Sequence, residues 1–541
     1  MKRRWGEFAR SSSLLSGAAT LGAAAIVSKL LGTLQKIPLQ NIGGDEVFGI
    51  YNAVYPLYIL VLYLATAGFP VAVSTFVAER IAKGEHDEAD RILRLAMGLM
   101  AGLGLIAFVF LFFGADQIAR WADNAHIGLA IRSVSFAFLF VPVMAALRGY
   151  YQGQQYMLPT GVSQVGEQMV RVMTMVILLI WFTQHGYSED WIAAGATFGS
   201  VTGAIAGLAI MVYFHWRNRG HDKQARDERR KKRDTESNAM LLKRLVLFAL
   251  PVCLGAIAVP VLNIVDTFTV PRLLKQMGMS ETAAMGQFGI YSRGLPLVQL
   301  VSMLFSSIAV ALVPAFSEAK ALGQRSILQA RAERVLRFTW LIGLAASVGL
   351  ALTALPVNVM LYTDRAGTST MALLAFTAVG SVINVVTASM LQGLGQVNRP
   401  AFHLLLAAAI KCVLNAIWVP LWGIRGAAAA AVVAFMVAAV LNVIALAKAV
   451  SIHIRWKDYI VRPVVPLGAM SLYLLLVAHG LEALLTDSFG TLNRAVYTAL
   501  GLVSVAGGGL IYMLTILRFG GITREEMHMF SRLARKNHDR K

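Results

Sequence analysis

Charged side chains are scarce in this sequence. Asp, Glu, Lys and Arg make up 14% of its 541 residues, whereas an average soluble domain carries roughly a quarter. Hydrophobic residues make up 57%, and apolar runs long enough to cross a hydrocarbon layer of about 30 Å recur along the chain. The composition therefore excludes an ordinary soluble protein and predicts an all-α polytopic membrane protein.

Cysteine and the signatures of common enzymes are also lacking. The two cysteines, Cys253 and Cys412, fall in predicted membrane helices and suggest no disulfide framework or zinc site. There is no G-x-x-x-x-G-K-[ST] phosphate loop, no histidine cluster and no nucleophile elbow. We expect no metal or cofactor. The short connections argue against a third alternative, a membrane-embedded glycosyltransferase or polymerase, so a transporter is favoured over an enzyme.

The apolar runs predict about 14 transmembrane helices. They lie at residues 13–35, 47–77, 93–114, 127–147, 158–182, 191–214, 245–271, 286–316, 336–360, 370–393, 401–419, 425–447, 463–480 and 493–517. Most of the 49 Lys and Arg residues lie in the terminal segments and in the even-numbered connections. The positive-inside rule then places both termini in the cytoplasm of a bacterial cell (inner) membrane. The net charge of +20 is spread over short loops, which argues against nucleic acid as a partner.

An internal repeat relates the two halves of the chain. Phe48-Gly49-Ile50-Tyr51 recurs as Phe288-Gly289-Ile290-Tyr291, and Gln152-Gly153 recurs as Gln392-Gly393 at the same offset. Six predicted helices fit into one repeat, so the halves have the same orientation. This pattern predicts two parallel six-helix bundles related by a pseudo-twofold axis, with two extra C-terminal helices.

The resulting organisation has five parts. We expect an N-terminal six-helix lobe (1–214), a basic cytoplasmic linker (215–244), a C-terminal six-helix lobe (245–447), additional helices 13 and 14 (448–517) and a basic cytoplasmic tail (518–541). Two facing bundles predict a central cleft and transport by alternating access, in a protein expected to be a monomer. The linker run 229–233 either contacts anionic membrane lipids or simply fixes the topology, and we favour the latter.

Ionisable residues inside membrane helices are costly and are functional candidates by default. The basic ones outnumber the acidic ones: Lys29, Arg132, Arg171, Arg293 and Lys411 against Glu167 and Asp266. A cation exporter would favour carboxylates. A surplus of Lys and Arg instead suits an anionic substrate, because arginine binds phosphate in a bidentate way.

The basic candidates each have an alternative role. Lys29 and Lys36 are seven residues apart on one predicted helix face and could both contact the substrate; alternatively Lys36 snorkels to the interface and Lys29 pairs with a carboxylate. Arg293 lies beside Pro296 and is either a substrate ligand or the partner of Asp266. Arg132 lies near a helix end and could simply snorkel.

The remaining candidates lie in the fifth, seventh and eleventh helices. Glu167 and Arg171 are four residues apart, so they form either a structural pair or a pair that opens to admit substrate. Asp266 and Asn263 could bind a coupling ion, Na⁺ or H⁺, and Lys411 is expected to line the interior. In the sixth helix a small-residue face predicts close helix packing; it comprises Gly195, Gly199, Gly203 and Gly207.

Three segments resemble the stage V sporulation protein B-like polysaccharide biosynthesis proteins. They are Arg148-Gly149-Tyr150-Tyr151-Gln152-Gly153 with the stretch that follows it to Val172, Gly68-Phe69-Pro70-Val71-Ala72-Val73-Ser74, and Ser28-Lys29-Leu30-Leu31-Gly32. This resemblance covers nearly the whole chain. It implies membership of the superfamily that includes lipid II flippases, O-antigen-type exporters and multidrug and toxin extrusion antiporters.

The resemblance implies a flippase for an undecaprenyl-pyrophosphate-linked saccharide, such as lipid II or a related precursor of peptidoglycan, cell-wall polysaccharide or sporulation material. Lys29 occupies the basic position of the flippases' first-helix motif, and Arg293 resembles their cavity arginine. Gln35 and Lys36 stand where those flippases carry an Arg-Asp pair, and the double arginine of their second helix has no match. The alternative is a cation antiporter of the same architecture, which the acid-poor interior disfavours.

Overall fold

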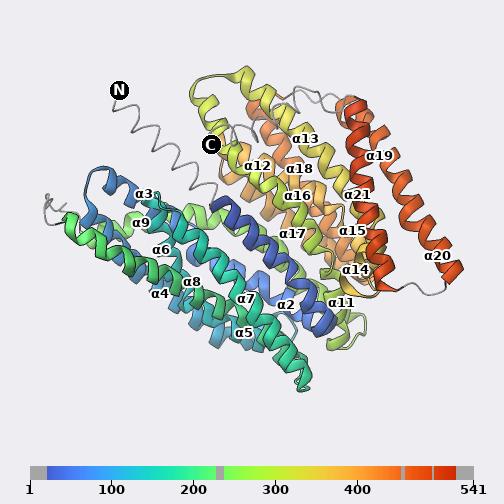
Figure 1. Cartoon of the computed structure of the whole chain (residues 1–541), viewed down its shortest axis with the longest axis horizontal. Coiled ribbons are helices and arrows are strands. Elements are labelled where there is room, and N and C mark those ends of the chain that lie inside the picture. The colour runs from blue at the N-terminus through green and yellow to red at the C-terminus, as the bar shows by residue number, and fades with distance from the viewer. Residues whose placement is uncertain (1–20, 227–236, 453–456, 490–492, 520–541) are drawn as a thin grey trace. The chain divides into compact units, whose positions relative to one another are not determined.

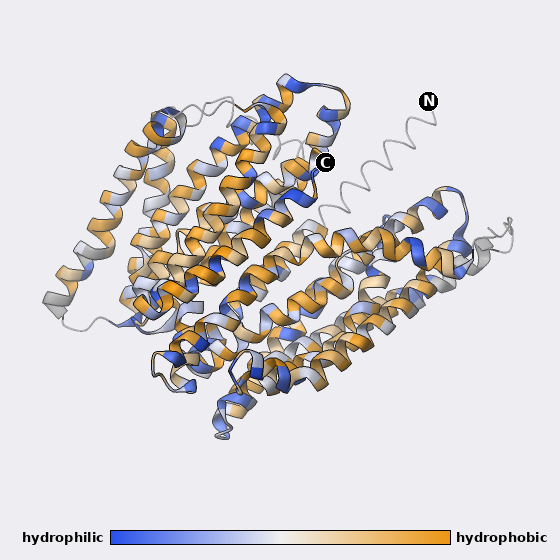
Figure 2. Cartoon of the chain, turned by 180° about the vertical axis from the view of Figure 1, so that it is seen from behind, coloured by the Kyte–Doolittle hydropathy of each residue, from blue (hydrophilic) through white to orange (hydrophobic). Residues whose placement is uncertain are grey.

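The computed structural model describes residues 21–226, 237–452, 457–489 and 493–519 (Figure 1). Within these ranges the chain forms helices and no strand, and 13 helical segments are long and apolar enough to cross a membrane. Hydrophobic residues dominate the helices, while hydrophilic residues gather near their ends (Figure 2). The all-α polytopic class is therefore confirmed. The basic run of the linker and nearly all of the tail lie outside the described residues.

The first of the 13 segments contains a reversal. It runs from Leu21 to Ala82 over 62 residues, and Gly44 interrupts it with φ 79° and ψ 179°. The Lys36 ammonium donates to the Asn52 side-chain carbonyl over 3.2 Å at a separation of 16 residues, which would span about 24 Å in a straight helix. The chain must therefore fold back at Gly44. This one segment accommodates the first two predicted passes, so the 13 segments fit the 14 predicted helices.

The chain divides into two compact units, Met1–Gly289 and Ile290–Lys541. The first contains helical residues 21–34 and then α2 (Lys36–Thr66), α3 (Phe69–Ala82), α4 (His86–Trp121), α5 (Ile127–Ser135), η1 (Phe136–Leu139), α6 (Val141–Gly153), α7 (Leu158–Gln184), α8 (Glu189–Arg226), α9 (Asn238–Ala256), α10 (Ala258–Gln276) and most of α11 (Glu281–Ser292).

The second unit contains the remaining helices. These are α12 (Leu295–Ala321), α13 (Arg325–Leu352), α14 (Ala354–Tyr362), α15 (Thr368–Leu374), α16 (Thr377–Gly393), α17 (Asn398–Trp422), α18 (Ile424–Val450), η2 (Lys457–Val461), α19 (Arg462–Leu474), η3 (Leu475–Leu481), α20 (Glu482–Phe489) and α21 (Arg494–Arg518). Helices α19 to α21 correspond to the predicted helices 13 and 14.

The boundary between compact units differs from the boundary between the predicted lobes. We expected the C-terminal lobe to begin at 245, yet α9 and α10 belong to the first unit. The Gly68 amide donates to the Cys253 sulfur over 3.1 Å, and the Thr267 hydroxyl donates to the Ala53 carbonyl over 3.2 Å. These contacts hold α9 and α10 against α2 and α3. The repeat describes the sequence, whereas the compact units follow tertiary packing.

The small-residue face of α8 packs against α7. A Cβ atom on Gly199 would lie 2.6 Å from the Arg171 carbonyl oxygen, and one on Gly203 would lie 2.7 Å from that of Glu167. Both distances are below van der Waals contact, so glycine alone lets the two backbones approach this closely. The predicted packing role of this face is confirmed, and it supports the turns of α7 that carry Glu167 and Arg171.

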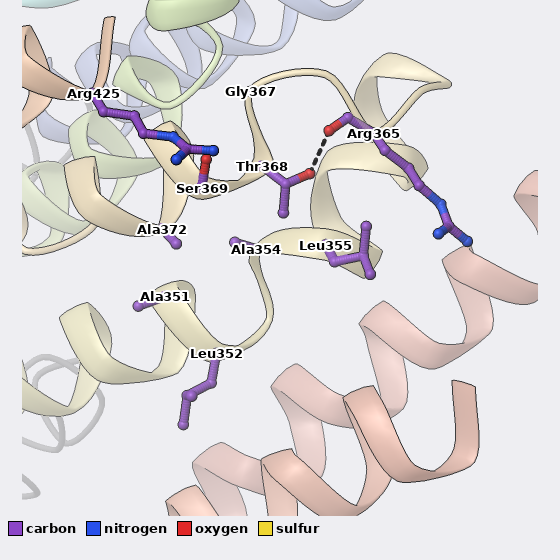
Figure 3. Close-up of a pocket in the computed structure, with 10 residues that line it drawn as sticks. All are labelled: Ala351, Leu352, Ala354, Leu355, Arg365, Gly367, Thr368, Ser369, Ala372 and Arg425. Atoms are coloured by element: carbon purple, nitrogen blue, oxygen red, sulfur yellow. Dashed lines mark hydrogen bonds between the residues drawn. The ribbon is translucent and has the colours of Figure 1, made fainter. Parts of the chain in front are cut away.

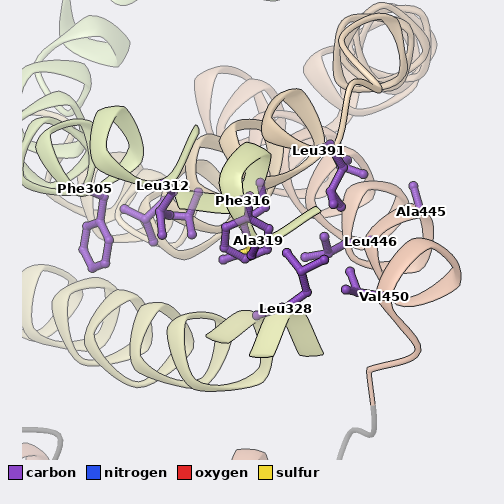
Figure 4. Close-up of a cluster of buried hydrophobic side chains, with 14 residues drawn as sticks. Phe305, Leu312, Phe316, Ala319, Leu328, Leu391, Ala445, Leu446 and Val450 are labelled. Carbon is purple, nitrogen blue, oxygen red and sulfur yellow. The ribbon is translucent and has the colours of Figure 1, made fainter. Parts of the chain in front are cut away.

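The second unit has its own apolar core. Buried side chains from α12, α13, α16 and α18 meet there, and among them Phe316, Val386 and Leu446 are fully buried (Figure 4). Close packing of these apolar side chains stabilises the unit.

Two equivalent glycines of the repeat approach each other within the first unit. A Cβ atom on Gly49 would lie 3.1 Å from the Gly289 amide nitrogen, and one on Gly289 would lie 3.1 Å from the Gly49 nitrogen. The added Cβ on Gly289 would also overlap the Asp45 carbonyl oxygen. These glycines thus permit α2 and α11 to cross with their backbones in contact.

We predict that Gly289→Ala destabilises the protein by about 1–3 kcal/mol, because the new methyl group overpacks a backbone crossing. Gly286→Ala on the same helix is the matched control, since a Cβ there meets nothing within 4 Å. It should be neutral or slightly stabilising, because alanine favours helix. Thermal unfolding in detergent measures both, and equal melting temperatures for the two variants would contradict the crossing.

Candidate functional site

A buried ionic triad links α6 and α7. The Arg148 guanidinium donates to Glu167 over 2.9 Å and to the Ser163 hydroxyl over 2.8 Å. The Arg171 guanidinium donates to the other Glu167 oxygen over 2.8 Å. The three charged side chains are 17%, 13% and 11% exposed. One carboxylate therefore serves two arginines, and the triad keeps a net positive charge.

Three tyrosines of α2 connect this triad to Lys36. Tyr51, Tyr55 and Tyr58 are spaced four and three residues apart and so share one helix face. The rings of Tyr51 and Tyr55 stack with centroids 5.7 Å apart, and those of Tyr55 and Tyr58 are 6.2 Å apart. The Tyr58 hydroxyl lies beside the Arg171 guanidinium. This tyrosine ladder thus ends at the triad.

Lys36 lies beside the tyrosine ladder, on the other arm of the hairpin. Its ammonium is 6.0 Å from the centroid of the Tyr55 ring and bonds the Asn52 carbonyl oxygen. The residue is 8% exposed, so the snorkelling alternative does not describe it. Gln35, its neighbour, donates to the Tyr51 hydroxyl over 3.1 Å. Lys36 has neutral oxygen and aromatic partners but no ion-pair partner among the described residues.

The cluster as a whole is positively charged and incompletely satisfied. Arg148 and Arg171 share the single carboxylate of Glu167, and Lys36, beside the tyrosine ladder, bonds a neutral amide oxygen. The Arg171 Nε, the Gln35 carbonyl oxygen and the Gln168 amide nitrogen are buried without a hydrogen-bond partner in this region. Buried donors that lack a partner are costly. We name this set of side chains, with the tyrosine ladder, the basic cluster; its chemistry suits an oxyanion.

Two other predicted substrate residues form none of the contacts that define the basic cluster. Lys29 is exposed, and no described residue bonds its ammonium, so it does not share the burial of Lys36. Lys411, on α17, is 1% exposed and is not without a partner. The tyrosine ladder therefore links Arg171 and Lys36, while roles for all four residues in substrate binding stay predictions.

Arg293 has a carboxylate partner that the sequence did not indicate. Its guanidinium makes a bidentate pair with Asp364, at 2.6 and 2.9 Å. The guanidinium carbon also lies 5.4 Å from the centroid of the Tyr362 ring. Tyr362 also donates its hydroxyl to the Arg293 carbonyl over 3.0 Å. Arg293 is 1% exposed, so it is held by this network.

The Arg293 guanidinium also changes the acidity of its partner. Partial burial raises the pKa of the Asp364 carboxyl, but the hydrogen bond from Arg293 and one from the Ala366 amide lower it further, and the net pKa falls below its usual value. A carboxyl with a depressed pKa stabilises the fold above its unfolded-state pKa, near 4. That contribution is lost as the pH falls through the lower folded-state pKa.

The predicted ion-binding pair does not form a shared buried site. Asp266 is 4% exposed and is not without a partner, whereas Asn263 is exposed. Among the described residues no group of three His, Cys, Asp or Glu side chains could hold a metal ion. A role for Asp266 and Asn263 in coupling stays a prediction.

A second polar feature is a pocket of about 460 Å³ in the second unit, at the ends of α13, α15 and α18. Arg425 and Ser369 approach each other across it, while Arg365 points away toward the C-terminal helices (Figure 3). Arg365 bonds the Tyr497 hydroxyl. Of the two exposed arginines that line the pocket, Arg425 is the one whose side chain approaches Ser369.

Sequence reasoning missed two functional candidates. Arg148 lies one residue beyond the predicted fourth helix, but α6 continues to Gly153, which carries Arg148 into the triad. Asp364 was treated as part of a polar connection. The signal for Arg148 was present in the family-like segment that begins with it.

Asp364→Ala should destabilise the protein by about 1–3 kcal/mol, because it leaves the buried Arg293 guanidinium without its carboxylate. Asp116→Ala is the control: it removes the partner of Arg132 in a pair whose side chains are 59% and 38% exposed, worth about 0–1 kcal/mol. Thermal unfolding at neutral pH compares them. A loss for Asp364→Ala no larger than the control would contradict the pairing.

Comparison with known proteins identifies relatives across the whole chain. Residues 14–320 match the family model described as "Polysaccharide biosynthesis protein". The chain is 31% identical to "Uncharacterized membrane protein YabM" of Bacillus subtilis, over 98% of this chain and 95% of that one. It is 26% identical to "Lipid II flippase MurJ" of the same organism, over 94% and 96%. It is also 26% identical to "Stage V sporulation protein B", over 95% and 97%.

Solved structures show the same fold. "Lipid II flippase MurJ, inward closed conformation" superposes with a TM-score of 0.64 at 14% identity, covering 92% of this chain and 97% of that one. An inward-facing multidrug resistance MATE family transporter of the MOP superfamily gives 0.62 at 17% identity, over 78% and 94%. The matched family model and the relatives over nearly the full length agree: the chain belongs to the polysaccharide biosynthesis protein family.

Proposed function

We propose that this protein moves an undecaprenyl-pyrophosphate-linked saccharide, lipid II or a related precursor, across the membrane by alternating access. The relatives include proteins named lipid II flippase and stage V sporulation protein B, which supports a lipid-linked substrate for cell-wall, polysaccharide or sporulation material. The observation that carries the proposal is the basic cluster, in which two largely buried arginines share one carboxylate and a buried lysine beside the tyrosine ladder bonds a neutral amide.

A pyrophosphate fits the groups that the basic cluster leaves unsatisfied. Its oxygens accept charge-assisted hydrogen bonds, and arginine presents planar donors that match them. Arg171 has an unused Nε, and Lys36 is held by a neutral amide. An anion arriving between them would compete with Glu167 for Arg171. Arg148 would keep Glu167 paired, so the carboxylate would not be stranded.

The transport cycle then follows from charge and hydrophobicity. The headgroup would enter from the cytoplasmic side while the lipid tail stays in the bilayer, and a change to an outward-open state would expose the headgroup on the opposite side. Lys29, Lys411 and Arg293 are further proposed contacts, with Arg293 requiring release from Asp364. The driving force would be the membrane potential or a gradient of Na⁺ or H⁺. No covalent bond is made or broken, and both termini would face the cytoplasm.

The alternative is a cation antiporter, which the likeness to a multidrug transporter fold favours. Such a transporter needs a carboxylate that can exchange its partner for an organic cation. Glu167 is already bridged by two arginines, and the net charge around it would repel a cation. The alternative predicts efflux of organic cations that Glu167→Gln abolishes, whereas the flippase proposal predicts no such efflux.

A vesicle assay tests the proposal. We expect the double variant Arg171→Gln with Lys36→Gln to slow flipping of a fluorescent undecaprenyl-pyrophosphate-linked saccharide at least about tenfold, because each cation loses a charge-assisted contact to phosphate. The measurement is the rate at which the headgroup becomes accessible to a membrane-impermeant quencher.

The matched control is Arg120→Gln with Arg132→Gln, which removes the same charge from membrane helices outside the basic cluster. Arg120 bonds Gln117 and Arg132 bonds Asp116, both at exposed positions. Flipping by the control should stay near the wild-type rate. Wild-type flipping by Arg171→Gln with Lys36→Gln, in protein that still elutes as a folded species, would remove the basic cluster from the mechanism.

A further inference from the structure

A groove in the second unit is formed by residues that do not belong to the basic cluster. It has a volume of about 560 Å³ and is formed by the start of α17 and the end of α18. Gly423 joins the two helices at their other ends with φ 59°, so they run antiparallel and pack along their length. Its lining comprises Asn398, Arg399, Phe402, His403, Leu441, Ile444, Ala445 and Lys448.

Two cations stand at one end of this groove. Arg399 is the second residue of α17, and Lys448 lies in the last turn of α18. Both are exposed, and no described residue forms a hydrogen bond or an ion pair with either of them. They therefore offer two unneutralised positive charges, one from each helix, at the end of a membrane span.

Beyond the two cations, one to two turns further along α17 and α18, the groove is lined by apolar side chains. Phe402 follows Arg399 by one turn and is 65% exposed, and Ile444 precedes Lys448 by one turn and is 46% exposed. Leu441 continues this wall by a further turn. Cations at the end of the span and apolar side chains deeper in it match the two parts of a lipid: a charged headgroup and an acyl chain.

Polar contacts beneath the groove hold its shape. The His403 ring lies 2.7 Å from the Asn442 side-chain carbonyl, through Nδ1, and the Asn442 amide donates to the Asn384 carbonyl over 2.7 Å. Asn442 is fully buried. This chain of three side chains ties α16, α17 and α18 together, so the groove is preformed.

We propose that this groove binds an anionic membrane phospholipid, with the headgroup phosphate between Arg399 and Lys448 and an acyl chain along Phe402 and Ile444. Basic pockets between membrane helices are suited to anionic headgroups, and each Lys or Arg near the surface contributes about a fivefold gain in affinity. Free phosphate would gain nothing from the apolar wall. The site belongs to the second unit alone and does not depend on what the protein transports.

Native mass spectrometry of the full-length protein tests this site. Detergent-solubilised protein would be titrated with phosphatidylglycerol, with phosphatidylcholine and with inorganic phosphate. We expect one phosphatidylglycerol to bind tightly and neither of the others to bind comparably. The double variant Arg399→Gln with Lys448→Gln should weaken that binding about thirtyfold, and Phe402→Ala should weaken it while leaving both charges in place.

The control is Arg94→Gln with Lys243→Gln. These residues are also exposed, lie near helix ends and do not line the groove, so the pair removes the same charge and should leave the tight site intact. The conservative variant Arg399→Lys with Lys448→Arg should restore binding and shows that the fold tolerates change there. Equal weakening in the groove and control variants, or equal binding of phosphatidylcholine, would overturn the proposal. Equally tight binding of inorganic phosphate would also overturn it.

Discussion

The cost of keeping a positive charge away from water is the constraint on which this structure depends. A buried guanidinium or ammonium needs a carboxylate, several neutral oxygens or a ligand to offset its lost hydration. The two units meet this cost differently. In the second, Arg293 has Asp364 to itself. In the first, Arg148 and Arg171 share Glu167, and the Lys36 ammonium donates to the neutral side-chain amide of Asn52. In the first unit the basic side chains of the cluster therefore outnumber their carboxylate, which favours an anionic ligand there.

Backbone geometry creates this concentration. The reversal at Gly44 brings Lys36 beside the helical face that carries Tyr51, Tyr55 and Tyr58. The close approach of α8 to α7 at Gly199 and Gly203 fixes the turns that carry Glu167 and Arg171. Helices buried among other helices satisfy their own backbone groups. A few glycines therefore determine where the side-chain charges meet.

The sequence predicted the helices well because their signal is local. Long apolar runs identify membrane passes without knowledge of their neighbours, and the four-residue glycine spacing identified the packing face of α8. Partners distant in sequence were harder to predict. Asp364 lies 71 residues from Arg293, in a connection that hydropathy treats as polar loop.

The two lysines show the same limit at short range. Spacing by seven suggested that Lys29 and Lys36 share an environment, and the backbone does stay helical at Gln35 between them, yet only Lys36 is buried. The helical period predicts a shared face within one continuous helix. It cannot predict how deeply each turn is buried or the fold-back at Gly44, because both are set by packing against the rest of the unit.

A high-resolution structure of the protein with an undecaprenyl-pyrophosphate-linked saccharide bound would test the central claim most directly. The basic cluster predicts phosphate oxygens within about 3 Å of Arg171 and Lys36, with Arg171 turned from Glu167 and Arg148 still paired with it. A bound headgroup elsewhere, with Arg171 still on Glu167 and Lys36 still on Asn52, would contradict the account.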